Sequence, residues 1–257
     1  TASEPVYNED GTYFKAFFSN GPRNPVEAMK YNTRTEKIDR SFNTVFANYK
    51  FMDGLVFNTT FSYDHSNNNY RSWSDPRTND GEKLNGILSI YRRQRDQIVW
   101  KNNLTYVKTF AEKHNLDILG GYEVNQYKSD YLFGEKTNFP STDKVFPSNG
   151  ATPSGVAGYL SGWRLLSYLS RANYNFNEKY FFGASVRVDG TSRLSPSQRW
   201  GTFWSVSGAW RVSEEAFMNS LNPVLSDVKL RASYGTNGTP PDNEYYYLDL
   251  TKFTYPY

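Results

Sequence analysis

The chain has 257 residues, no cysteine and a formal net charge of +3, from 29 basic and 26 acidic residues. The lack of cysteine excludes a disulfide framework and a thiolate metal site, and the balanced charge gives no reason to propose nucleic acid as a partner. Mean hydropathy is −0.72 although 18% of the residues are aromatic. A strand protein with one face on lipid and one on water averages to such a value.

The sequence contains no run of about 18 apolar residues, which excludes a transmembrane helix. It begins TASEPVYNED, with no signal peptide. If the protein is exported, we expect its true start to precede residue 1 and the chain to be a fragment.

Residues 1–37 are expected to form a long external loop, because turn signals such as Asp10-Gly11 and Asn24-Pro25 recur there. Within it, Pro25 to Met29 is predicted to form one helical turn with Asn24 as its N-cap.

Period-two alternation of apolar and polar residues predicts eight strands after this loop. They cover residues 41–51, 55–64, 97–110, 115–124, 166–176, 180–189, 204–211 and 228–235. A short helical connection is predicted over Ser213 to Ser220, between the last two strands.

The connections between these strands alternate between short turns and long loops. Strands of about 9 to 14 residues also exceed the usual five or six of globular proteins. Both features are typical of outer-membrane barrels, which have short periplasmic turns and long external loops. The predicted fold class is therefore an all-β, antiparallel transmembrane β-barrel, with eight strands forming a section of a larger wall. Closure of the eight strands into a small barrel is an alternative.

One face of the predicted strands is polar and charged. In a barrel these side chains point into the lumen, where acids and bases are expected to form charge networks on a hydrated wall. The predicted lumen-facing residues are Lys101, Asp117, Glu123, Arg171, Arg187, Asp189, Arg211, Lys229 and Arg231.

The other face is apolar and rich in aromatic residues, which in a barrel contact lipid and form girdles near the strand ends. The predicted lipid-facing aromatics are Tyr168, Tyr174, Tyr180, Phe182, Trp204, Trp210 and Tyr234. Ligand or lid contacts are expected in the external loops. The candidates are Tyr70, Trp73, Tyr245, Tyr246 and Tyr247.

No catalytic residue, metal or cofactor is predicted. The sequence has no GxSxG motif and no P-loop, and its two histidines, His65 and His114, lack the ligand spacing of a metal site. A glycosidase carboxylate pair on the polar face stays open as an alternative, although charge networks are favoured.

Five phrases in the second half of the chain resemble the SusC/RagA family of TonB-linked outer-membrane transporters. They are YLSRANYN (168–175), ASVRVDGTSR (184–193), RWGTF (199–203), SVSGAWR (205–211) and LSDVKLRASYG (225–235). YNEDG (7–11), Asn24-Pro25 and LTY (104–106) are similar more weakly. The match is densest over residues 165–235.

The resemblance implies a 22-stranded barrel plugged by an N-terminal domain and driven by the TonB complex. It also implies a SusD-like surface lipoprotein as a lid, import of glycan or peptide fragments, and a place in the bacterial outer membrane. The plug and the TonB box are not in this chain. The alternative is a soluble, secreted β-sandwich that binds or cleaves carbohydrate.

Overall fold

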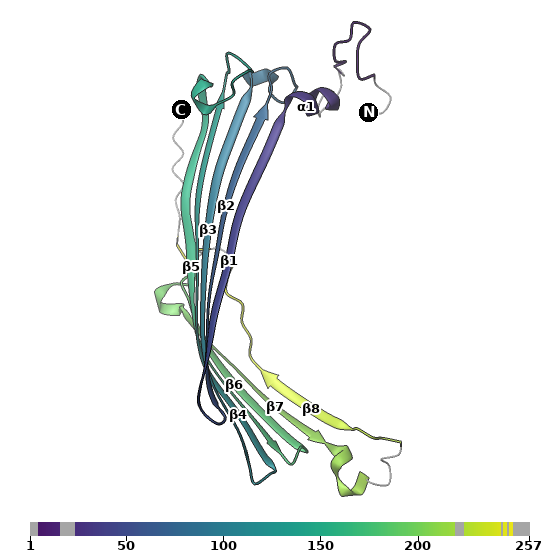
Figure 1. The fold of residues 1–257 in the computed structure, drawn as a ribbon, viewed down its shortest axis with the longest axis vertical. Helices are drawn as coiled ribbons and strands as arrows, with labels where there is room; N and C mark the ends of the chain where they lie inside the picture. Colours follow the sequence, from purple (N-terminus) through teal and green to yellow (C-terminus); the bar gives the residue numbers. More distant parts are fainter. Residues whose placement is uncertain (1–4, 16–23, 219–223, 243, 246, 249–257) are drawn as a thin grey trace. The chain divides into compact units, whose positions relative to one another are not determined.

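A computed structural model describes residues 5–15, 24–218, 224–242, 244–245 and 247–248. Eight strands form one sheet in which each strand lies beside its neighbour in the sequence (Figure 1). The strands are β1 (Thr33–Met52), β2 (Leu55–Ser74), β3 (Ile87–Phe110), β4 (His114–Thr137), β5 (Thr152–Phe176), β6 (Tyr180–Thr191), β7 (Trp200–Arg211) and β8 (Lys229–Gly235). The predicted all-β, antiparallel class is confirmed.

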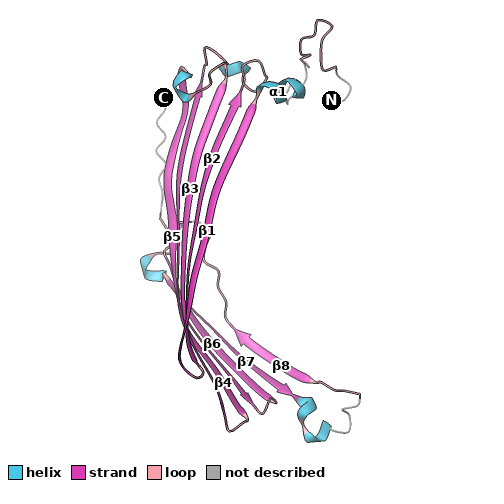
Figure 2. Ribbon diagram, in the orientation of Figure 1, coloured by secondary structure: helices cyan, strands magenta, loops and turns pink. Residues whose placement is uncertain are grey.

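Among the residues that the structure describes, helical structure is confined to short segments outside the sheet (Figure 2). They are the α-helix α1 (Pro25–Tyr31) and the 3-10 turns η1 (Glu82–Leu84), η2 (Pro147–Asn149), η3 (Pro196–Gln198), η4 (Val212–Glu214) and η5 (Ala216–Met218). No helix in the described ranges has the length and apolar character needed to cross a membrane.

The sheet overturns two of the alternatives drawn from the sequence. A β-sandwich needs two sheets packed face to face, whereas all eight described strands belong to a single sheet. The strand order has β1 and β8 at its two ends, so these eight strands do not close a barrel by themselves.

The first five strands are much longer than predicted. β1 and β2 have 20 residues each, β3 and β4 have 24, and β5 has 25. The prediction of a loop over residues 1–37 is therefore wrong from Thr33 onward. The loop of about twenty residues predicted after Asp64 contains the end of β2, and the loop predicted over residues 136–162 contains the start of β5. The far end of β2 is polar on both faces, as in Asn67 to Asn69, so it shows no alternation.

The predicted alternation of connection lengths is present. Short turns at 53–54, 111–113 and 177–179 alternate with connections at 75–86, 138–151 and 192–199. Gly54 shows why the first turn needs its glycine: φ is +84°, and a Cβ there would collide with the carbonyl oxygen of Val107. The Gly54 carbonyl also accepts a 2.8 Å hydrogen bond from the Val107 amide, which ties this turn to β3.

The chain divides into two compact units. Unit 1 comprises Thr1–Ser41, His65–Asp96 and Ser129–Ser161. It contains α1, whose N-cap Asn24 accepts hydrogen bonds from the amides of Val26 and Glu27, as predicted. Its small core consists of Trp73, Leu88 and Phe139, with Ile90 and Val145 packed against them.

Unit 2 comprises Phe42–Asp64, Gln97–Lys128 and Gly162–Tyr257. The helical connection predicted over 213–220 consists of η4 and η5 instead of one α-helix, and residues 219 and 220 lie outside the described ranges. Unit 2 contains the hairpins whose alternation was clearest in the sequence.

Candidate functional site

The strand register of unit 2 sorts its side chains onto two faces, because directly opposed residues in an antiparallel pair share a face. Tyr174 opposes Phe182, and Tyr180 opposes Trp210. The register gives all seven predicted lipid-facing aromatics one face: Tyr168, Tyr174, Tyr180, Phe182, Trp204, Trp210 and Tyr234. Their contact with lipid stays a prediction.

The rings on this aromatic face form two rows. In the first, His114 packs against Phe110 and Phe176 with centroids 4.9 Å apart in both pairs. In the second, Tyr168 contacts Tyr122 at 5.4 Å and Trp200 at 6.3 Å. On β4 and on β5 the rows are eight residues apart, which is about 26 Å along a strand and about 20 Å at a tilt of about 40°. This separation is close to the height of the apolar band of an outer-membrane barrel, about 25 Å.

The opposite face of unit 2 is polar. The register places six of the nine predicted lumen-facing residues on it: Arg171, Arg187, Asp189, Arg211, Lys229 and Arg231. Asp117 joins them through an ion pair with Arg171 at 3.9 Å. Glu123, six residues further along β4, is on the same side by alternation and lies 3.9 Å from Lys101. That this polar face lines a barrel lumen stays a prediction.

A short charge pair on the polar face joins Arg187 to Asp189. The Arg187 Nε donates to both carboxylate oxygens, at 2.7 and 2.9 Å, and its Nη2 donates to the buried hydroxyl of Ser167 at 2.9 Å. Nearer the end of the wall, Arg211 donates to Asp227 at 3.1 Å. Paired in this way, these side chains form charge networks within the wall.

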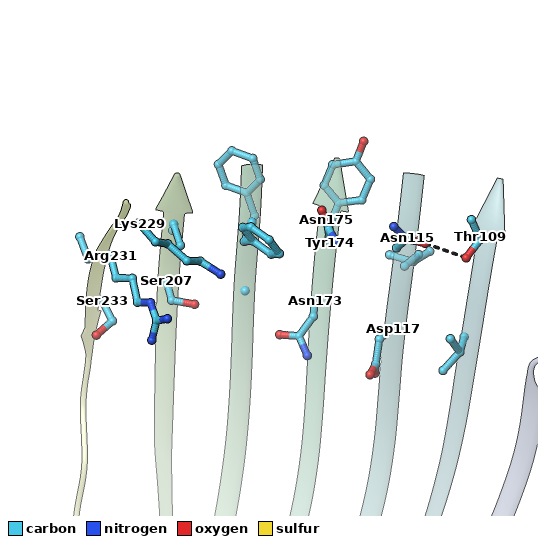
Figure 3. A pocket seen from close by; sticks show the side chains of 18 residues that line it. Thr109, Asn115, Asp117, Asn173, Tyr174, Asn175, Ser207, Lys229, Arg231 and Ser233 are labelled. Carbon is cyan, nitrogen blue, oxygen red and sulfur yellow. Dashed lines mark hydrogen bonds between the residues drawn. The ribbon is translucent and has the colours of Figure 1, made fainter. Parts of the chain in front are cut away.

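A hollow of about 650 Å³ lies on the polar face near the short turns. Figure 3 shows the polar side chains that line it: Thr109, Asn115, Asp117, Asn173, Asn175, Ser207, Lys229, Arg231 and Ser233. Thr109 donates to Asn115 at 2.7 Å, and the Lys229 ammonium lies 3.6 Å from the Phe181 ring centre. Beside apolar side chains such as Val107 and Phe181, the hollow offers amides, hydroxyls, two cations and the Asp117 carboxylate, which are groups suited to binding a polar segment or ligand.

Four tyrosines of unit 1 form a continuous row across strands β2 to β5, which we call the tyrosine ladder: Tyr70, Tyr91, Tyr131 and Tyr159. Successive ring centroids are 4.7, 5.8 and 5.0 Å apart. The prediction that Tyr70 lies in an external loop is wrong, because it belongs to β2.

Sequence reasoning missed the other three tyrosines, because their segments were interpreted as loops or left unassigned. The only available signal was the short alternation of Ser89, Tyr91 and Arg93 with Leu88 and Ile90.

The other predicted loop contacts have different settings. Trp73 also belongs to β2 rather than to a loop, and with 5% of its surface exposed it is a core residue of unit 1. Tyr245 and Tyr247 follow β8 and are partly exposed, whereas Tyr246 lies outside the described residues. A ligand contact at Tyr245 or Tyr247 stays a prediction.

Asp75 stabilises the loop between β2 and β3 through hydrogen bonds. It is 2% exposed and accepts hydrogen bonds from the Arg77 guanidinium at 2.8 Å and from the Trp73 indole at 3.3 Å. Burial raises the pKa of Asp75, but the hydrogen bonds and charge of Arg77 outweigh it and hold the pKa below its usual value. The Asp75 amide donates to Asn32 at 2.8 Å, which connects this loop to the start of β1.

Comparison with known proteins gives the context of these surfaces. No family model matches the chain. It is 30% identical over 254 residues to the TonB-dependent receptor P3 of Formosa agariphila, covering 98% of this chain and 25% of that protein. It is 26% identical over 223 residues to the TonB-dependent receptor SusC of Bacteroides thetaiotaomicron, covering 85% of this chain and 21% of SusC. The chain thus spans about a quarter of the length of the curated relatives that it matches.

The fold is also that of a solved transporter. The structure of the RagAB peptide transporter superimposes with a TM-score of 0.81 at 24% identity, over 92% of this chain and 27% of that one. A second structure of RagAB, a peptide importer in its open-open state, gives a TM-score of 0.77 at 22% identity, over 90% of this chain and 26% of that one. The family resemblance indicated by the sequence phrases is thereby confirmed: over most of its length the chain is similar to a section of TonB-dependent receptors that include SusC, and it has the fold of a section of the RagAB barrel.

Proposed function

We propose that this chain is part of the wall of an active importer in the bacterial outer membrane, which takes up oligosaccharide or peptide nutrients. The observation that carries the proposal is the strand register of unit 2, which puts an aromatic face and a charged face on opposite sides of one sheet. A wall between lipid and a hydrated lumen needs this division. The similarity to TonB-dependent receptors supports it.

In this proposal the aromatic face meets lipid, with its two rows near the membrane interfaces. The charged face lines the lumen, and its hollow contacts the plug of the complete protein. The long connections face the exterior, where a SusD-like lipoprotein covers the barrel. About 9–11 strand residues cross a bilayer, whereas β3 and β4 have 24 residues each. Their remaining residues, on the side of the long connections, therefore project beyond the membrane.

The mechanism is transport without covalent chemistry. Substrate is captured beneath the lipoprotein, and the TonB complex pulls on the plug to open a path. The residues of this chain act as the fixed wall in that cycle. The pairing of Arg187 with Asp189 and Ser167 suits such a role, because a satisfied polar network keeps its geometry.

The test uses the complete gene that encodes this chain. The protein is expected in detergent-solubilised outer membranes, to migrate faster on a denaturing gel when unheated, and to support nutrient uptake that stops when TonB is deleted. Recovery of a water-soluble, monodisperse protein, or uptake independent of TonB, contradicts the proposal.

A further inference from the structure

In the tyrosine ladder, neighbouring rings cover part of one another's faces. Tyr70 and Tyr91 stack with their planes only 11° apart, so their faces cover each other. Tyr131 lies between Tyr91 and Tyr159, with ring centroids 5.8 and 5.0 Å away. Tyr159, at one end of the row, is 51% exposed. The ladder therefore offers a strip of apolar edges and phenolic hydroxyls across four strands, about 15 Å long at the usual strand spacing.

The charged side chains at the ladder are engaged with the tyrosines themselves. The Arg93 guanidinium lies 4.8 Å from the Tyr131 ring centre and donates to the Tyr159 hydroxyl at 3.3 Å. Glu36 accepts from the Asn68 amide at 2.7 Å and from the Tyr91 hydroxyl at 3.4 Å. The charges of Arg93 and Glu36 are opposite and balance each other. A charged ligand would lose binding free energy there, because its charge would be buried without a partner.

These features define the ligand that the strip fits. A phenolic hydroxyl both donates and accepts hydrogen bonds, as do the hydroxyls of a sugar, and the ring edges supply apolar contact. We propose that the tyrosine ladder is a binding strip for a linear, electrically neutral oligosaccharide. The inference rests on the proposed import function and names both the substrate class and the residues that meet it.

The experiment measures binding to the complete, detergent-purified transporter by calorimetry. The probes are neutral octasaccharides of α-1,4-glucan, β-1,4-mannan and β-2,1-fructan, and an uncharged octapeptide capped at both ends. At least one octasaccharide is expected to bind. Tyr131→Ala and Tyr159→Ala should each weaken its binding about tenfold, equivalent to the loss of one aromatic contact.

Two further variants separate contact from fold. Leu132→Ala is the matched control, since Leu132 follows Tyr131 on β4, points to the other side of the sheet and is 60% exposed. It should leave Kd unchanged. Tyr159→Phe keeps the ring and removes the hydroxyl, so it should weaken binding less than Tyr159→Ala does.

The proposal is overturned if no octasaccharide binds, if only the capped peptide binds, or if both alanine variants keep the wild-type Kd. If Tyr131→Ala no longer migrates differently with and without heating, that variant does not fold into a barrel, and the binding by Tyr159→Ala, at a half-exposed residue, is then the test. If the wild-type protein forms a barrel and supports TonB-dependent uptake but binds no octasaccharide, the proposal for the tyrosine ladder is wrong and the import proposal stands. If the wild-type protein forms no barrel or supports no TonB-dependent uptake, the import proposal itself is wrong.

Discussion

Asp75 and Arg77 form a two-point ion pair, with the Arg77 Nε and Nη2 each 2.8 Å from a different oxygen of the Asp75 carboxylate. Because Asp75 is almost fully buried, the pair shapes the whole loop between β2 and β3. Asp75→Ala leaves the buried Trp73 indole without its acceptor and leaves the half-exposed Arg77 to solvent, and it should destabilise unit 1 by about 1–3 kcal/mol. The measurement is the rate at which protease cleaves residues 75–86 in the purified protein.

Two variants bracket this result. Asp75→Asn keeps the shape and loses the charge, so its cleavage rate should lie between those of wild type and Asp75→Ala. Asp130→Ala, at an exposed carboxylate in the same unit, should behave as wild type. Equal cleavage rates in all four proteins would show that Asp75 does not hold the loop.

Glu215 predicts a dependence of stability on acid pH. It accepts hydrogen bonds from the Tyr180 hydroxyl at 2.6 Å and from the Trp210 indole at 3.1 Å, and Lys179 lies 3.6 Å away. The hydrogen bonds from Tyr180 and Trp210 lower the pKa of Glu215 against the opposing effect of burial, and Lys179 lowers it further. A lowered folded pKa means that the stabilisation is complete above the unfolded value of about 4.3 and is lost as pH falls through the folded pKa.

The measurement is the urea midpoint of the complete protein at pH 7 and at pH 3. Wild type should lose more stability between these values than Glu215→Gln, which cannot ionise. An equal loss in both proteins excludes this role for Glu215.

Gly54→Ala tests the first hairpin. The positive φ and the carbonyl oxygen of Val107 both oppose a side chain at position 54. The substitution should therefore destabilise the protein by at least about 1 kcal/mol, seen as a lower melting temperature. Gly120→Ala is the matched control, since a Cβ at Gly120 meets no atom within 4 Å. Similar melting temperatures for the two variants would contradict this explanation of the turn.

Phe182→Arg tests which face meets lipid. Phe182 is 59% exposed on the aromatic face and opposes Tyr174, two residues inward from the row that contains Phe176. Arginine on the lipid side of a barrel costs about 2–4 kcal/mol at mid-membrane and about 0–1 kcal/mol near the interfaces, so an intermediate cost is expected here. Insertion into lipid vesicles should fall for this variant. Ser185→Arg, on the opposite face of the same strand, should insert normally. Equal insertion of both variants contradicts the assignment of the faces.

The sequence predicted the fold best where the two faces of a strand differ in polarity. Over residues 165–211 the alternation identified β5, β6 and β7, together with the turn at 177–179, and the register pairs Tyr174 with Phe182 as the two faces require. The family phrases cover the same stretch. In this stretch, a shift of one residue in the pairing of two strands would exchange their apolar and charged faces. The alternation of the sequence therefore specifies the register of the strands.

Sequence reasoning failed where that contrast is absent. The far end of β2 carries polar residues on both sides, such as Asn67 to Asn69, so its sequence predicts a loop. The tyrosine ladder joins residues from four strand ends that the alternation did not assign to strands. The Asp75 loop likewise depends on Asn32, 43 residues away. Side-chain contacts over such distances follow from strand pairing, which local patterns do not reveal.

The unequal lengths of β5 and β6 leave one side of β5 open. Within the described residues, β6 pairs with β5 only from Leu165 to Phe176, whereas β5 begins at Thr152. The backbone amides and carbonyls of residues 152–163 on that side form an edge, and an exposed edge is a template for adding another strand. Preparations of residues 1–257 alone should therefore associate side by side through this edge, which makes the complete protein the right material for every binding measurement.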